Sequence, residues 1–143
     1  MSLDPHNKLA GVHPDLVRVV KAAAQEPQAF EIVYGLRTIQ AEAEAVATGH
    51  SETMHSRHLP DDHYANAAMA VDFACLTNGA VDWTVADAQG GIYGQAAKQI
   101  LDAAEHLGVK CQWGGAAVGA WVDGQVSHFH DWGHIQLDPS EYP

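Results

Sequence analysis

Ala70-Val71-Asp72-Phe73-Ala74-Cys75-Leu76 is the stretch around which we expect this chain to fold. The run is apolar on both of its alternating sides, which is typical of a strand in the middle of a sheet. Its one charged residue, Asp72, must lie at or near the interior, where a carboxylate needs a cation or several hydrogen-bond donors. Spacing alone leaves two interpretations open, a structural ion pair or turn cap and a functional ligand.

One histidine precedes this strand in the sequence, and another begins a second apolar run near the end of the chain. His58 stands in a polar loop that leads into the strand, and His134 begins the apolar run His134-Ile135-Gln136-Leu137. Taken alone, His134 would more often be a hydrogen-bonded histidine of a strand. Two histidines and one carboxylate are, however, the donor set of a catalytic zinc site, which leaves its fourth position to water. The three residues together predict a zinc hydrolase.

The remaining elements follow from hydrophobic periodicity. Apolar residues at three- and four-residue steps predict helices, and short runs of β-forming residues predict strands. The predicted helices are 14–25, 39–48 and 91–107, the further strands are 30–34, 109–113 and 134–137, and residues 50–67 and 114–124 are predicted loops. Residues 81–83 follow a turn at 77–80 and receive no assignment.

Composition limits the class of protein. With 143 residues, 47% of them hydrophobic, the chain is expected to form a single domain, residues 1–143. Seven Lys and Arg against 18 Asp and Glu give a net charge of -11, which argues against nucleic acid as a partner. We expect a monomer with two reduced thiols, Cys75 and Cys111. The sequence shows neither a signal peptide nor a run that could insert into a membrane, so we expect cytoplasmic synthesis.

A set of motifs then carries a family resemblance. Ser56-x-His58, Asp72 and Asp131-x-x-His134, together with Trp113-Gly114-Gly115, resemble the zinc peptidases of phages and bacteria that cut peptidoglycan stem peptides. That family comprises L-alanyl-D-glutamate endopeptidases and D-alanyl-D-alanine carboxypeptidases and dipeptidases. The resemblance covers about residues 31–137.

The resemblance implies a fold, a site and a reaction. The fold would be α+β, with a small antiparallel sheet that carries the zinc and helices that flank it, as in the hedgehog-like relatives. Zinc would be held by His58, Asp72 and His134, Asp131 would be the general base, and Arg37 would hold the substrate or its oxyanion. An endolysin-like enzyme would reach the cell wall after release and hydrolyse the L-Ala–D-Glu bond through a zinc-activated water. The alternatives are a D-Ala-D-Ala carboxypeptidase or dipeptidase and a non-catalytic, zinc-containing wall-binding module.

The chain departs from the family pattern between the first two ligands. The family usually separates its first histidine and its aspartate by seven positions, whereas His58 and Asp72 are fourteen apart. We interpret residues 60–67 as an insertion. His63 lies in this insertion and is an alternative ligand, but His58 keeps the flanking residues of the family. His63 is then expected, with Ser56, at the rim of the substrate cleft.

A second alternative is the pair His128 and His130. In a strand these side chains would share one face, so His-x-His is itself a credible zinc pair, used by the lysostaphin-like relatives. We rank the pair below His134, which keeps the apolar strand that follows the family's histidine. The two imidazoles are otherwise expected to line the cleft.

Overall fold

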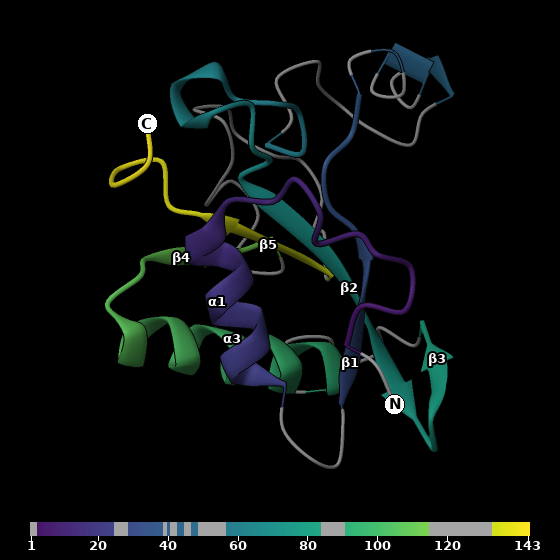
Figure 1. Ribbon diagram of the computed structural model, residues 1–143. Helices are drawn as coiled ribbons and strands as arrows, with labels where there is room; N and C mark the ends of the chain where they lie inside the picture. Colours follow the sequence, from purple (N-terminus) through teal and green to yellow (C-terminus); the bar gives the residue numbers. More distant parts are fainter. Residues whose placement is uncertain are drawn as a thin grey trace.

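The computed structural model describes residues 3–24, 29–38, 40, 43–44, 47–48, 57–83, 91–114 and 133–143. Its elements, in chain order, are α1 (Pro14–Ala23), β1 (Phe30–Tyr34), the short 3-10 helix η1 (Asp62–Tyr64), β2 (Ala70–Thr77), β3 (Ala80–Asp82), α3 (Ile92–Leu107), β4 (Cys111–Trp113) and β5 (His134–Leu137) (Figure 1). Half of the predicted helix 39–48 lies outside the described residues, and positions 40, 43–44 and 47 are helical.

All strands belong to one antiparallel sheet. The order is β1-β2-β5-β4, and β3 pairs with the far end of β2. The central place predicted for β2 is therefore confirmed, as is the α+β class. The unassigned residues 81–83 overlap β3, which follows a tight turn with positive φ at Asn78 and Gly79. A strand of three residues is too short to show an alternating pattern in the sequence.

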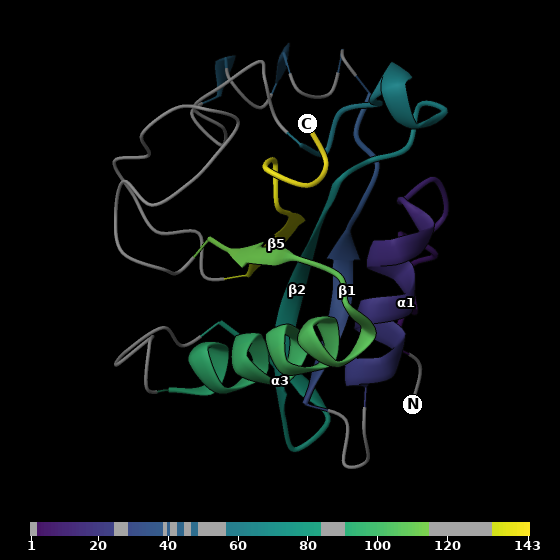
Figure 2. The ribbon, with the colours of Figure 1, turned by 90° about the vertical axis from the view of Figure 1, so that its left-hand side faces the viewer.

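The sheet has one apolar and one polar face. Alternate residues of β2 and β5, Val71, Phe73, Ile135 and Leu137, join a single core with α1 and α3. Figures 1 and 2 show α3 lying across one end of the sheet, with α1 packed against it. The strand residues that alternate with these core residues point to the opposite face of the sheet. This second face carries the polar side chains Asp72, Gln112, His134 and Gln136.

The helix ends explain two small differences from the predicted boundaries. His13 caps α1, because its Nδ1 accepts the N–H of Asp15 at 3.0 Å, and the helix ends at Ala23 instead of residue 25. Gly108 is in the left-handed conformation and ends α3 after Leu107, the predicted last residue of this helix. The N–H of Val109 then donates to Ala104, so this residue completes the helix end, and β4 begins at Cys111 instead of residue 109.

Both cysteines are free thiols, Cys75 buried and Cys111 partly buried. Burial raises the pKa of each thiol to about 12, so both stay protonated at neutral pH. Within the described part of the chain, no helix combines the length and the apolar character needed to cross a membrane.

Candidate metal centre

Three side chains from distant parts of the sequence converge on the polar face of the sheet. Oδ1 of Asp72 lies 3.1 Å from Nε2 of His58 and 3.1 Å from Nδ1 of His134. The two imidazole side chains are 5% and 4% exposed, whereas Asp72 is 20% exposed. The three donor atoms lie within 4.8 Å of one another, which is close enough for all of them to bind one metal ion. The structure thus brings together the three residues predicted as ligands.

Strand register positions two of the three. Asp72 of β2 and His134 of β5 are directly opposite each other, so their side chains share one face of the sheet. Their neighbours Val71 and Ile135 are also paired and point into the core. A slip of one residue would turn Asp72 into the core, so the burial of the apolar face fixes the geometry of the site.

The third residue, His58, reaches the site because the expected insertion folds back on itself. The N–H of Asp61 donates to Ala67 at 3.0 Å, which closes a loop around η1. Outside this loop, the N–H of Met69 donates to the carbonyl of Arg57 at 2.8 Å. The two ends of the inserted segment therefore lie side by side, and the extra residues do not separate His58 from Asp72.

His63 lies apart from this group. Its side chain is 81% exposed and contacts Asp61 and Asp62, 3.3 and 3.2 Å away, within the closed loop. Of the two histidines considered for the first ligand position, it is His58 that lies beside Asp72.

Outer hydrogen bonds set the tautomer of each histidine. Nδ1 of His58 lies 2.8 Å from the carbonyl oxygen of Gly35, which only accepts, so this nitrogen carries the proton. Nε2 of His134 lies 2.9 Å from Oε1 of Gln136, whose amide nitrogen donates to Gln112. In the neutral rings, the lone pairs of Nε2 of His58 and Nδ1 of His134 then both face Asp72.

This arrangement favours a cation. Two nitrogen lone pairs and a carboxylate oxygen repel one another unless a positive charge lies between them. In the metal-free site the histidines themselves take the place of this cation: burial raises the pKa of Asp72, but positive charge on His58 and hydrogen bonds donated by both histidines outweigh this effect and hold the pKa well below its usual range. Asp72 is therefore an anion at neutral pH, and the donor set of two imidazoles and one carboxylate fits zinc.

Two glycines allow the backbone to approach the site closely. A Cβ at Gly35 would collide with the carbonyl oxygen of Lys8 and lie 2.8 Å from Val12. A Cβ at Gly133 would lie 2.5 Å from the carbonyl oxygen of Phe73, whose N–H donates to Gly133 at 2.7 Å. Any larger residue at either position would displace the backbone next to a candidate ligand.

Arg37 lies beside the segment that carries His58. Its N–H donates to the carbonyl of His58 at 2.8 Å, and its guanidinium carbon lies 5.5 Å from the ring centre of Tyr34. Tyr34 is opposite Asp72 in the pairing of β1 with β2. The arginine predicted to contact substrate is thus anchored at the edge of the candidate metal centre.

Four predicted site residues, Asp131, Ser56, His128 and His130, lie outside the described residues. Their roles stay predictions.

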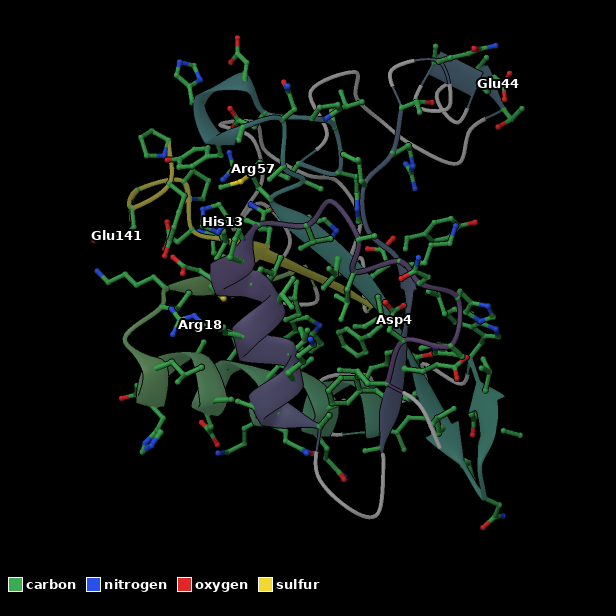
Figure 3. The ribbon with its side chains drawn as sticks, in the orientation of Figure 1. Asp4, His13, Arg18, Glu44, Arg57 and Glu141 are labelled. Carbon is green, nitrogen blue, oxygen red and sulfur yellow. The ribbon has the colours of Figure 1, made fainter. Side chains whose placement is uncertain are left out.

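The residues that hold the two histidines through hydrogen bonds were not predicted from the sequence. Gln136 could have been found, because it lies two positions after His134 in a strand and must share its face. Gly35 and Gln112 gave no such signal, since their contacts are made across the fold. Arg57 was also missed: its guanidinium donates to the carbonyl of Tyr142 at 2.8 Å and so ties the C-terminal segment to the residue before His58. Figure 3 shows Arg57 beside this segment, at the end of α1 where His13 lies.

Comparisons with known proteins bear on the family and on the fold of the chain. The profile of the family described as "Phage L-alanyl-D-glutamate peptidase" matches residues 1–138. The L-alanyl-D-glutamate peptidase of Escherichia phage T5 is 32% identical over 136 residues, which cover 91% of each chain. The crystal structure of the Serratia marcescens L-Ala D-Glu endopeptidase ChiX is similar with a TM-score of 0.72 and 33% identity, over 95% of this chain and 87% of that one.

Proposed function

Because the chain belongs to the phage L-alanyl-D-glutamate peptidase family, we propose that it hydrolyses the L-Ala–D-Glu bond of peptidoglycan stem peptides with a zinc ion held by His58, Asp72 and His134. The observation that carries the proposal is the convergence of two imidazole nitrogens on one carboxylate oxygen. The phage T5 relative and the Serratia marcescens protein are both named for this bond.

The exposure of the three side chains supports a catalytic metal instead of a purely structural one. A structural zinc site is closed by four protein ligands, whereas the described part of the chain brings three together here. The imidazoles are buried, but Asp72 is 20% exposed, so solvent and substrate can approach on the side of the carboxylate. When bound, zinc polarises the scissile carbonyl and makes water a stronger acid.

The proposed roles of the other residues follow from their positions. Asp131, three residues before His134, accepts the proton of the attacking water and returns it to the leaving amine. Arg37, anchored beside His58, binds a carboxylate of the substrate or the developing oxyanion through its planar guanidinium. Ser56 and the described residue His63 would contribute to the cleft rim.

We propose that His128 and His130 line the same cleft.

We further propose that the protein acts as a monomer on the cell wall, and that its stem-peptide substrate is recognised locally. A net charge of -11 repels anionic peptides at long range, so the metal and Arg37 must supply the attraction.

Mass spectrometry of purified muropeptides after incubation with zinc-loaded protein tests the proposal. The expected products are a muramyl fragment that ends in L-Ala and a free peptide that begins with D-Glu. Release of terminal D-alanine or a dipeptide would favour the carboxypeptidase alternative, and intact muropeptides would favour a non-catalytic wall-binding module. Asp72→Ala is the inactive control, and Asp102→Ala is its matched control, because Asp102 is 61% exposed and pairs with Lys98 on α3, outside the metal centre.

A further inference from the structure

We propose that Gln136 and Gln112 are positioning residues, which hold His134 in the tautomer that presents Nδ1 to the metal. This inference rests on the proposed function, because it assigns a role to residues around the proposed zinc site. The feature in question is the orientation of the buried amide of Gln136. This amide contacts Nε2 of His134, the ring nitrogen that does not face Asp72, and Gln112 contacts the amide of Gln136.

The two glutamines form a short relay that begins at the metal centre. Nε2 of His134 lies 2.9 Å from Oε1 of Gln136, and Nε2 of Gln136 donates to Oε1 of Gln112 at 3.2 Å. Gln136 has no solvent exposure. Water therefore does not compete for its amide, and the protein groups around it decide which way the amide points.

The direction of this amide decides where the proton of His134 lies. With the oxygen toward the imidazole, Nε2 must carry the proton, and Nδ1 offers its lone pair beside Asp72. A rotated amide would turn its NH2 group toward Nε2. The proton of the neutral ring would then move to Nδ1, between the imidazole and Asp72, where it would block the metal.

In the orientation that the structure shows, Gln112 is the acceptor for the NH2 group of Gln136. It is opposite Gln136 in the pairing of β4 with β5, so the sheet itself sets the distance between the two amides. Its oxygen accepts from the NH2 group of Gln136 and leaves the oxygen of Gln136 for His134. His58 needs no such relay, because its Nδ1 partner is the backbone carbonyl of Gly35, which cannot donate.

The first test is zinc affinity, measured by competition with a chelator for variants of Gln136. We expect Gln136→Leu and Gln136→Met to weaken zinc binding by about 10–100-fold, as loss of a partner of a metal-bound histidine typically does. Gln136→Glu should stay within about threefold of the original affinity, because a carboxylate also accepts from Nε2. If Gln136→Leu binds zinc as tightly as the original protein, or if Gln136→Glu is as weak as Gln136→Leu, the proposal is wrong.

A double variant separates orientation from packing. Gln112→Leu alone should weaken zinc binding, since the amide of Gln136 can then rotate. In the Gln136→Glu background the same change should have no further effect, because the two oxygens of a carboxylate are equivalent and need no orienting partner. Equal losses in both backgrounds would mean that Gln112 acts through packing, against the proposal.

The last measurement is independent of zinc. Nitrogen-15 NMR of metal-free protein should show a proton on Nε2 of His134, and in Gln136→Leu the neutral ring should carry its proton on Nδ1 instead. An unprotonated Nε2 in the original protein would overturn the inference. Failure of the original protein to bind zinc would overturn the proposed function alone, since the tautomer is still measurable. Circular dichroism and the Tm of the metal-free variants check that each has folded.

Discussion

Asp72 in β2 and His134 in β5 are directly opposite each other, and Oδ1 of the carboxylate lies 3.1 Å from Nδ1 of the imidazole. The pair is made by strand register, and His58 is added to it by a loop closed between Asp61 and Ala67. The metal centre therefore depends both on the sheet and on the return of the inserted segment to its starting point.

Replacement of Asp72 by Ala should remove bound zinc and activity together. The carboxylate oxygen is the atom that both imidazoles face, so its loss leaves two ligands and no anionic donor. Elemental analysis of the purified variant measures the metal directly. Asp102→Ala, which changes an exposed residue of α3, should keep zinc, and stoichiometric zinc in Asp72→Ala would contradict the assignment.

Asp131→Asn should keep zinc and lose turnover by about 10²–10⁴-fold, the usual contribution of proton transfer to a positioned base. The amide resembles the carboxylate in shape but cannot accept the proton. The measurement pairs zinc content with the rate of muropeptide cleavage. Loss of metal from this variant would show that Asp131 is a ligand instead of a base.

Arg37→Lys should lower cleavage by about 10–100-fold while zinc content stays unchanged. A lysine keeps the charge but cannot make the two parallel hydrogen bonds of a guanidinium. Arg18→Lys is the matched control, because Arg18 lies on the exposed side of α1 and pairs with Asp15. Full activity in Arg37→Lys would exclude a bidentate contact with the substrate.

Gly133→Ala should destabilise the fold by about 1–3 kcal/mol, the usual cost of forcing an added carbon into a packed site. The new Cβ would lie 2.5 Å from the carbonyl oxygen of Phe73, so the backbone before His134 must move and zinc should bind more weakly. Urea unfolding and chelator competition measure the two effects.

Gly108→Ala is the comparison for this variant. It has open space around the added carbon but a φ of +72°, so it should lose about 1–2 kcal/mol of stability and keep its zinc affinity. A zinc affinity in Gly133→Ala equal to that of Gly108→Ala would show that the close approach at Gly133 does not support the metal centre.

Tyr142→Phe should lower stability by about 0.5–1 kcal/mol between about pH 4 and pH 10, after allowance for the partial exposure of Asp15. The hydroxyl of Tyr142 donates to Asp15 at 2.7 Å, and this bond lowers the pKa of Asp15. The same site raises the pKa of Tyr142 to about 12, first through burial and then through the bond to Asp15.

The sign of the pH dependence follows from these two shifts. Because the pKa of Asp15 is lower in the folded state, its ionised carboxylate stabilises the fold at pH values above its pKa in the unfolded chain. This stabilisation is lost as the pH falls through the folded-state pKa. A raised phenol pKa stabilises below the unfolded value and is lost as pH rises towards about 12. The Tm values of the two proteins should therefore differ between about pH 4 and pH 10 and converge below about pH 4 and towards about pH 12, and a constant difference in Tm would contradict the assignment.

The sequence by itself determined the class of fold and the composition of the candidate site. Runs of β-forming residues predicted β1 and β5 at their observed bounds, because such residues pack well on the buried surface of a sheet. Asp72 stood out in the apolar run of β2 because a carboxylate near the interior needs a cation or several hydrogen-bond donors. The family, too, was recognised from local motifs, and the comparisons confirm it.

Only the tertiary structure decided which residues meet. It joined His58, and not His63, to Asp72, and it placed the carbonyl of Gly35 and the amide of Gln136 against the two imidazoles. These contacts depend on strand register and on where a loop closes, which link residues up to 62 positions apart, as for Asp72 and His134. Periodicity reports which face of an element is buried, but not which element covers that face, because many pairings bury the same apolar surface and only packing of the whole chain selects one.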